Sequence, residues 1–310
     1  MNEFDLIDTI TSGLPVPDFV ALGIGDDAAV VDLSGSQVVA CTDMLIEGRH
    51  FRKAWSSAED IGHRVAAANL ADLVAMGAAP LALMVAMAIP VETETGWAAD
   101  VIDGVQAEAD LLGAAVIGGD TNSTDGPIVI SATALGDMRG RNPIRRSGAR
   151  PGDQVALVGR QGWAAAGLTV LSRGFRSPRV LVDALRRPNV PYEAGIDAAA
   201  AGATSMIDVS DGLLADLGHI ADASGVGIDI ESDALRVDEP LKDTAVAFTM
   251  DPLSWVLTGG EDHSLAATFP GDASLPEGFY RIGRVIGDEV GVTVDGNEPR
   301  GARGWRHFGP

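Results

Sequence analysis

Residues 73–91 read LVAMGAAPLALMVAMAIPV, and this stretch decides the fold class. It carries no charge and is about as long as a membrane-spanning helix, so a spanning helix is one interpretation. However, GAAP at residues 77–80 interrupts the apolar run and Pro90 ends it. Because proline breaks a helix interior, we predict a helix that ends near Met76, a turn, and a buried strand from Leu81 to Ile89.

Strand-like and helix-like segments alternate on both sides of this stretch, which favours an α/β or α+β class. In the first half we predict strands at 38–42, 81–89, 115–117 and 128–135 and helices at 58–76 and 96–112. The first helix has a capping pattern, SAED, at residues 57–60. A Gly-, Pro- and Arg-rich linker at 140–153 precedes a second half, in which we predict strands at 154–158, 205–209, 227–230, 264–269 and 280–286, and helices at 163–171, 213–223 and just before Thr258.

The charge of the chain limits its partners. Its 310 residues carry a formal net charge of -22. Nucleic acid and anionic membranes would be repelled by such a surface, so an anionic ligand needs added positive charge. A single cysteine, Cys41, excludes an intrachain disulfide and fits a reducing compartment. The acidic start MNEFDLIDTI does not resemble a signal peptide, and we expect a cytoplasmic protein.

Acidic residues recur at the edges of apolar segments. They are the Asp26-Asp27 pair in VALGIGDDAAVV at 20–31, Asp43 after VVACT, Asp120 in AAVIGGDT, and Asp208 and Asp211 in SMIDVSDG. Asn69 and Asp72 share one face of the helix at 58–76. Each acid taken alone also fits a turn or a helix cap. Taken together, carboxylates at strand ends converge on one cleft, and oxygen ligands without His or Cys spacing favour Mg²⁺, Mn²⁺ or Ca²⁺ over zinc.

The usual nucleotide-binding motifs are absent from the sequence. No G-x-x-x-x-G-K-[ST] loop occurs, neither the protein-kinase nor the Rossmann spacing appears in context, and lysine is found only at Lys53 and Lys242. A bound phosphate must then be held by metal ions, arginine and main-chain amides of turns such as Gly118-Gly119. Arg145-Arg146 is a candidate clamp, or a solvated basic loop.

Seven motifs now occur in order: GIGDDAAVV, TDMLIEGRHF, AAANLADLVAMGA, IGGDT, RRSGARPGD, IDVSDGL and TGGEDH. Together they resemble the thiamine-monophosphate kinase family, in the superfamily of aminoimidazole ribonucleotide synthetase and selenophosphate synthetase. The resemblance runs from about residue 22 to Gly304-Trp305. It implies an α/β fold of two domains. Domain 1–148 would bind ATP and magnesium and pair its sheet across a homodimer, and the α/β domain 149–310 would close the active site.

The resemblance also implies roles for single residues. Magnesium would be bound by Asp27, Thr42, Asp43, Asp72, Asp120, Asp208 and Asp211, with Asp27 and Asp211 central to catalysis. ATP would contact Gly119, Asp120, Arg146 and Ser210, and thiamine monophosphate would contact His50, Glu261 and Trp305. These last three also fit a satisfied histidine, a strand-edge acid and a packing aromatic. One departure is Cys41, where a serine is expected. The change is harmless if this position acts through its main-chain carbonyl, whereas a thiol in place of a ligand hydroxyl would be a poor partner for Mg²⁺.

The implied reaction is ATP-dependent phosphorylation of thiamine monophosphate to thiamine diphosphate, by direct transfer of the γ-phosphoryl group to the acceptor phosphate. That phosphate is largely ionised at neutral pH, so no general base is needed. One alternative is another ATP-dependent synthetase of the superfamily. A selenophosphate synthetase would be expected to carry a reactive Cys near a Lys close to the N-terminus, and MNEFDLIDTI has neither. The other alternative is a non-catalytic protein that binds divalent ions or nucleotides.

Overall fold

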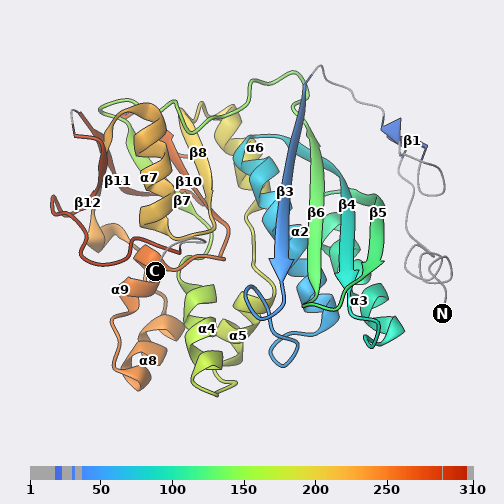
Figure 1. The fold of residues 1–310 in the computed structure, drawn as a ribbon. Helices are drawn as coiled ribbons and strands as arrows, with labels where there is room; N and C mark the ends of the chain where they lie inside the picture. The colour runs from blue at the N-terminus through green and yellow to red at the C-terminus, as the bar shows by residue number, and fades with distance from the viewer. Residues whose placement is uncertain (1–17, 23–29, 32–36, 288, 306–310) are drawn as a thin grey trace. The chain divides into compact units, whose positions relative to one another are not determined.

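The computed structural model describes residues 18–22, 30–31, 37–287 and 289–305 (Figure 1). The chain forms two compact units. The N-terminal unit comprises residues 1–73 and 78–142, and the C-terminal unit comprises residues 74–77 and 143–310. Each unit contains its own β-sheet, so the expectation of a mixed α/β protein is confirmed.

The N-terminal unit is built on a four-stranded sheet with the order β3-β6-β4-β5. Strand β6 runs antiparallel to both of its neighbours, and β4 and β5 are parallel. The elements are β3 (Val38–Ile46), α2 (Ala58–Ala75), β4 (Ala79–Ile89), α3 (Thr95–Asp110), β5 (Ala115–Ser123) and β6 (Val129–Asp137). A separate antiparallel pair joins β1 (Val20–Leu22) and β2 (Val30–Val31).

Helices α2 and α3 lie behind the sheet as it is viewed in Figure 1. They cross at small residues: a Cβ on Gly62 would lie 2.0 Å from the carbonyl oxygen of Val101, and one on Gly104 would lie 2.1 Å from that of Glu59. Only glycine permits so close a contact between the two helix backbones. At the start of α2 the predicted cap is confirmed, because Ser57 Oγ accepts from the Asp60 N–H at 3.1 Å and Asp60 Oδ2 accepts from the Ser57 N–H at 3.1 Å.

The opposite face of this sheet carries exposed apolar side chains. Side chains alternate between the two faces of a strand, so Val38, Ala40, Thr42 and Met44 share one face of β3. Val38 is 49% exposed and Met44 is 51% exposed, and Met84 on β4 is 37% exposed on the same face. We call this surface the open face. Its exposed methionines and valine make it an apolar surface in a chain of strongly negative charge.

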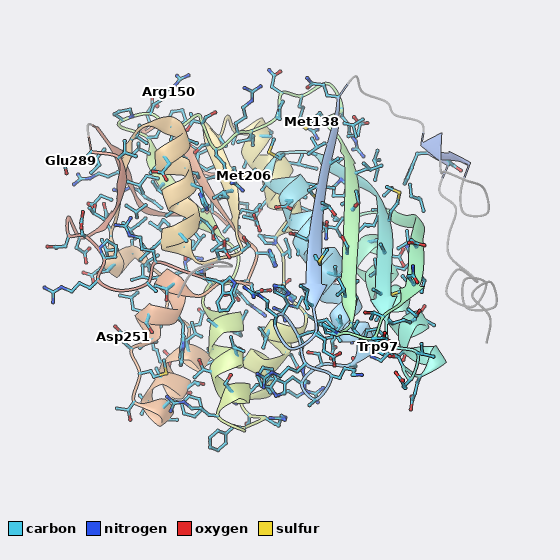
Figure 2. The ribbon with its side chains drawn as sticks, viewed as in Figure 1. Trp97, Met138, Arg150, Met206, Asp251 and Glu289 are labelled. Atoms are coloured by element: carbon cyan, nitrogen blue, oxygen red, sulfur yellow. The ribbon has the colours of Figure 1, made fainter. Side chains whose placement is uncertain are left out.

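The stretch at 73–91 folds as a helix end, a turn and a strand. Helix α2 ends at Ala75, and β4 runs from Ala79 to Ile89 between β5 and β6. In the described part of the chain, no helix combines the length and the hydropathy that crossing a bilayer requires. Figure 2 shows Met138 just past the end of β6 and Trp97 in the first turn of α3, at opposite ends of this unit.

The C-terminal unit holds a six-stranded sheet with the order β12-β9-β11-β7-β10-β8. Neighbouring strands are antiparallel, except that β12 and β9 are parallel. The strands are β7 (Gln154–Val158), β8 (Ser205–Val209), β9 (Gly227–Ile230), β10 (Ser264–Phe269), β11 (Tyr280–Ile286) and β12 (Gly291–Val294). The helices are α4 (Trp163–Ser172), α5 (Arg179–Arg186), α6 (Tyr192–Ala200), α7 (Leu213–Ser224), the 3₁₀ turn η1 (Ser232–Ala234), α8 (Glu239–Phe248) and α9 (Pro252–Thr258).

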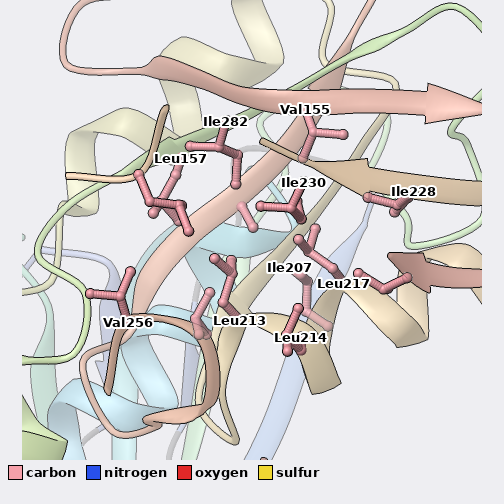
Figure 3. Packing of buried hydrophobic residues seen from close by; sticks show 14 of the residues in the cluster. Val155, Leu157, Ile207, Leu213, Leu214, Leu217, Ile228, Ile230, Val256 and Ile282 are labelled. Carbon is pink, nitrogen blue, oxygen red and sulfur yellow. The ribbon is translucent and has the colours of Figure 1, made fainter. Parts of the chain in front are cut away.

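The core of this unit lies between its sheet and its helices. Figure 3 shows aliphatic side chains of β7, β8, β9 and β11 packing against Leu213, Leu214 and Leu217 of α7 and Val256 of α9. Leu213 and Leu217, four residues apart, lie on one face of α7, as amphipathic helical spacing requires. This packing fixes the start of α7 against the end of β8.

The predicted strands of the second half agree with the observed ones residue for residue, whereas all four strands of the N-terminal sheet are longer than predicted. Strand β3 continues to Ile46 because residues 43–46 still pair with 129–132 of β6, and β5 continues to Ser123 because it pairs with β4. The prediction that Asp43 and Asp120 follow their strands is therefore wrong, since both lie within them. Helices α5, α6 and α8 and strand β12 were not predicted, and all four are short elements of 4 to 10 residues.

Candidate active site

The predicted site residues fall in both units, and each unit is described by itself. The N-terminal unit contains Thr42, Asp43, His50, Asp72, Gly119 and Asp120. The C-terminal unit contains Arg146, Asp208, Ser210, Asp211, Glu261 and Trp305. Asp27, with the rest of the Gly-Ile-Gly-Asp-Asp turn, lies outside the described residues.

Asp43 lies on the side of β3 that faces α2. Its N–H donates to Asn69 Oδ1 at 3.2 Å, and the Asn69 side-chain amide donates to the Val65 carbonyl at 2.8 Å. On the same side of β3, the Cys41 thiol donates to the Asn69 carbonyl at 3.2 Å. Asn69 is completely buried, so its hydrogen bond fixes the main chain of Asp43 against α2.

Asp72 lies one turn further along α2, on the same face as Asn69. Burial raises the pKa of the Cys41 thiol, and the nearby carboxylates of Asp72 and Asp43 raise it further. The prediction that Asn69 and Asp72 share a helix face is confirmed, because both contact Cys41. A protonated thiol is a weak metal ligand and a weak nucleophile, and the observed contacts of Cys41 are packing and hydrogen bonds to Asn69.

Thr42 points to the opposite, open face. Its hydroxyl donates to the Ala132 carbonyl at 2.9 Å and accepts from Thr133 Oγ1 at 3.1 Å. Asp120 is exposed on β5, and its register partner across β4 is Ala86. Strands β3 and β5 are three strand spacings apart, about 14 Å. This sheet therefore brings Asp43 close to Asp72, and it keeps Asp120 with Gly119 well away from both.

His50 follows β3 in a tight turn that closes back on the strand. Its Nδ1 accepts from the Ile46 N–H at 2.9 Å, and its carbonyl accepts from the buried Arg64 guanidinium at 2.7 Å. Because Nδ1 is an acceptor, the neutral ring carries its hydrogen on Nε2. The side chain therefore presents a hydrogen-bond donor, and a proton on Nδ1 would break the bond to Ile46.

In the C-terminal unit, Asp208 is buried within β8. Its Oδ2 lies 3.0 Å from Nδ1 of His263, which is equally buried. His263 has a positive φ of 50° at the entry to β10, the strand that pairs with β8. A buried carboxylate needs such a partner, and the contact fixes the orientation of Asp208.

The turn Ser210–Gly212, between β8 and α7, connects several of the predicted site residues of the C-terminal unit. The Ser210 carbonyl accepts from the Glu261 N–H at 2.9 Å, and the Asp211 carbonyl accepts from the Trp305 N–H at 2.9 Å. Three segments that are remote in sequence therefore meet at one turn. They bring together Asp208, Ser210, Asp211, Glu261 and Trp305, which are five of the predicted site residues.

The Asp216 side chain stabilises this turn by accepting hydrogen bonds from its main chain. Its Oδ2 accepts from the N–H groups of Asp211 at 3.0 Å and Gly212 at 2.9 Å. The side chain is buried, and burial raises the pKa of Asp216 to about 7, with the negative charge of Asp208 as the next cause. A carboxylate in the first turn of a helix also interacts favourably with the helix dipole.

The GGEDH segment is fixed on its other side by Asp262. Its two carboxylate oxygens accept from the Gly162 N–H at 2.7 Å and the Ala164 N–H at 2.9 Å, at the start of α4. Complete burial raises the pKa of Asp262 to about 7, against these hydrogen bonds, which lower it. Gly260 allows the segment to approach the turn, since a Cβ there would lie 2.1 Å from the Ser210 carbonyl oxygen.

Arg146 lies away from this turn. Its carbonyl accepts from Ser224 Oγ at 2.8 Å, at the C-terminal end of α7. Helix α7 has 12 residues and is about 18 Å long, and Asp211 precedes its other end. The C-terminal unit therefore does not place the Arg146 main chain beside Ser210, although both were predicted to contact ATP.

Three residues of the C-terminal unit that fix predicted site residues were not themselves predicted, namely Asp216, Asp262 and His263. All three are polar and buried, and each makes a hydrogen bond that fixes a predicted site residue or its segment. A signal for Asp216 was present, because an acid in the first turn after SDGL is typical of a capped helix. Nothing local identified the other two, whose partners lie 55 or more residues away.

The donor chemistry suits a hard divalent cation. Asp43 with Asp72, and Asp208 with Asp211, offer carboxylate oxygens of the kind that Mg²⁺ prefers. Among residues 18–22, 30–31, 37–287 and 289–305, no three His, Cys, Asp or Glu side chains are grouped so that they could hold a metal ion. Each described unit thus offers pairs of acids, which leaves coordination positions for phosphate oxygens and water.

Comparisons with known proteins identify the family of the chain. The chain matches the family model "AIR synthase related protein, N-terminal domain" over residues 25–138 and "AIR synthase related protein, C-terminal domain" over residues 150–295. It is 45% identical to a thiamine-monophosphate kinase of Mycobacterium tuberculosis, over 100% of this chain and 92% of that protein.

Two solved structures share the fold over nearly the whole chain. One is AaThiL complexed with AMPPCP and TMP, which is 31% identical, with 99% of this chain and 97% of that chain covered and a TM-score of 0.83. The other is thiamine-monophosphate kinase from Stenotrophomonas maltophilia K279a, which is 34% identical, with 95% of each chain covered and a TM-score of 0.80.

Proposed function

Since this chain belongs to the thiamine-monophosphate kinase family, we infer that it transfers the γ-phosphoryl group of ATP to thiamine monophosphate, giving thiamine diphosphate and ADP. The observation that carries this assignment to particular residues is the turn Ser210–Gly212. It gathers Asp208, Asp211, Glu261 and Trp305 from three segments of one unit. A protein catalyses phosphoryl transfer mainly by positioning the substrates and neutralising their charge, and the side chains gathered at this turn would do both.

The acidic residues would serve the reaction through magnesium. Asp43 with Asp72 in one unit, and Asp208 with Asp211 in the other, would each contribute ligands to Mg²⁺. Thr42, which points to the open face, Asp120, whose strand lies about 14 Å from β3, and Asp27 remain proposed ligands outside these two pairs. Mg²⁺ supplies charge neutralisation at the phosphate oxygens. In a chain with a net charge of -22 and two lysines, this source of positive charge lets anionic substrates bind.

The substrates are positioned by the remaining predicted residues. Gly119, Arg146 and Ser210 would contact ATP, and His50, Glu261 and Trp305 would contact thiamine monophosphate. His50 acts as a donor through Nε2–H, since its Nδ1 accepts from Ile46. The acceptor phosphate is the nucleophile and is already largely ionised, so the reaction needs no side chain that removes a proton.

Domain 1–148 is the domain of ATP and magnesium binding and of dimerisation, and domain 149–310 closes the site. The open face supports a homodimer, because Val38, Met44 and Met84 would be removed from water by a second copy of the same sheet. We also propose a cytoplasmic location, which the single cysteine, Cys41, supports because it fits a reducing compartment.

A coupled ADP-release assay tests this function. ADP formation by the wild type should require both Mg²⁺ and thiamine monophosphate, and thiamine diphosphate should be recovered in equal amount. Asp211→Asn removes a charge but little volume, so it should abolish turnover at sub-millimolar Mg²⁺ and leave the thermal melting temperature within a few degrees of the wild type. ADP release that is independent of thiamine monophosphate would refute the assignment.

A further inference from the structure

We propose that Asp216 is a positioning residue for the reaction, and that it acts by holding the Ser210–Gly212 turn in the shape that presents Asp211. The proposal rests on the proposed function of that turn. It names a residue outside the predicted ligand set, one whose role is to accept hydrogen bonds from the main chain.

The contacts of Asp216 are unusually concentrated. One oxygen, Oδ2, accepts from two consecutive main-chain N–H groups, those of Asp211 and Gly212, at 3.0 and 2.9 Å. In return the Asp216 N–H donates to the Gly212 carbonyl at 2.9 Å, as the first turn of α7. The side chain is buried, so water does not replace it as the acceptor.

These hydrogen bonds fix the orientation of the peptide groups in the turn. With the Asp211 and Gly212 N–H groups held on Asp216, the carbonyls of Ser210 and Asp211 are free to accept from Glu261 and Trp305, each at 2.9 Å. Gly212 has a φ of 131°, a conformation that glycine tolerates. Without the acceptor, the buried N–H of Gly212 and the half-buried N–H of Asp211 are left unpaired, and the turn relaxes toward another conformation. Asp211, Glu261 and Trp305 would then move together.

Two variants separate a hydrogen-bond acceptor from a charge. Asp216→Asn keeps an oxygen that can accept from both N–H groups but removes the charge, whereas Asp216→Ala removes the acceptor. The matched control is Asp229→Ala. Asp229 is also buried and accepts from the Gly296 N–H at 2.8 Å and Thr293 Oγ1 at 2.6 Å. It lies on β9, four strand spacings from β8, about 19 Å away.

The experiment measures amide hydrogen exchange at Asp211, Gly212, Glu261 and Trp305, the affinity for Mn²⁺ in the absence of substrates, and kcat and KM for thiamine monophosphate across a Mg²⁺ series. Asp216→Ala should exchange at least tenfold faster at Asp211 and Gly212, bind Mn²⁺ at least tenfold more weakly, and lose about a hundredfold in kcat. Asp216→Asn should stay within about threefold of the wild type in all three. Asp229→Ala should lose thermal stability and change none of them.

Two results would overturn the proposal. One is wild-type exchange at Asp211 and Gly212 in Asp216→Ala. The other is an Asp216→Asn variant with wild-type exchange but with activity as low as the alanine variant, which would make the charge of Asp216 the functional feature. Asp216→Ser, whose side chain is too short to reach both N–H groups, replaces the alanine variant if the latter does not fold. Exchange and Mn²⁺ binding need no substrate, so they test Asp216 even if the wild type fails to phosphorylate thiamine monophosphate.

Discussion

Gly260→Ala offers a direct test of the geometry around the Ser210–Gly212 turn. A Cβ at this position would lie 2.1 Å from the Ser210 carbonyl oxygen, 2.9 Å from the Ser210 carbonyl carbon and 3.0 Å from the Asp211 carbonyl carbon. Real Cβ contacts are essentially never shorter than 3.0 Å, so the turn or the GGEDH segment must move by about 1 Å. Because the obstacle is backbone, no side-chain rotation relieves it.

The expected losses follow from that displacement. A shift of about 1 Å lengthens the 2.9 Å hydrogen bond from Glu261 N–H to Ser210 O beyond useful range. Overpacking costs about 1–3 kcal/mol and the lost hydrogen bond adds roughly 1 kcal/mol, so the free energy of unfolding should fall by about 2–4 kcal/mol. Misplacement of the reacting groups by about 1 Å should lower kcat/KM by about a hundredfold.

Gly218→Ala is the matched control. Gly218 lies within α7, where an added Cβ would meet nothing within 4 Å. Alanine is favoured over glycine in a helix interior, so this variant should gain about 0.5–1 kcal/mol and keep wild-type activity. Urea unfolding and the coupled ADP-release assay measure both effects. A Gly260→Ala variant with wild-type stability and kcat/KM would refute the close approach of the GGEDH segment to the turn.

Three further changes have defined outcomes. His50→Ala should raise the KM for thiamine monophosphate about tenfold, roughly 1.4 kcal/mol of binding, with a smaller loss of kcat; a collapsed kcat and a lost acid limb in the pH profile from pH 5 to 9 would instead make His50 a general base. Asp262→Asn should become more stable relative to the wild type as the pH rises from about 4 to about 7. In that window the folded wild type retains a proton at Asp262 that the unfolded chain has released, so its free energy of unfolding falls with rising pH, by an order of a few kcal/mol in total; a difference in melting temperature that does not change with pH would argue against the raised pKa. Met44→Asp on the open face should convert a dimer near 64 kDa, twice 32.0 kDa, to monomer in light scattering; an unchanged mass would exclude this face as the interface.

Much of the fold could be predicted because its signals are local. The caps, turns and apolar periods of the C-terminal half placed β7, β8, β9, β10 and β11 at their observed bounds. Pro80 and Pro90 separated a buried strand from a membrane span. The seven ordered motifs identified the family, because each motif is a short run of residues that can be recognised in the sequence without knowledge of the fold.

The tertiary structure decided what depends on partners remote in sequence. Asp43 and Asp120 lie in apolar segments that look alike in the sequence. The strand order separates the strands that carry them, β3 and β5, by about 14 Å. Hydrogen bonds across 55 residues, from Asp208 to His263, and across about 100 residues, from Asp262 to the start of α4, are invisible to local patterns. Such pairings are selected by packing over the whole chain, because burying a polar group is tolerable only where a distant segment supplies its partner. The sequence by itself therefore predicted which residues carry the chemistry, and the long-range packing decided which of them share a turn and which lie apart.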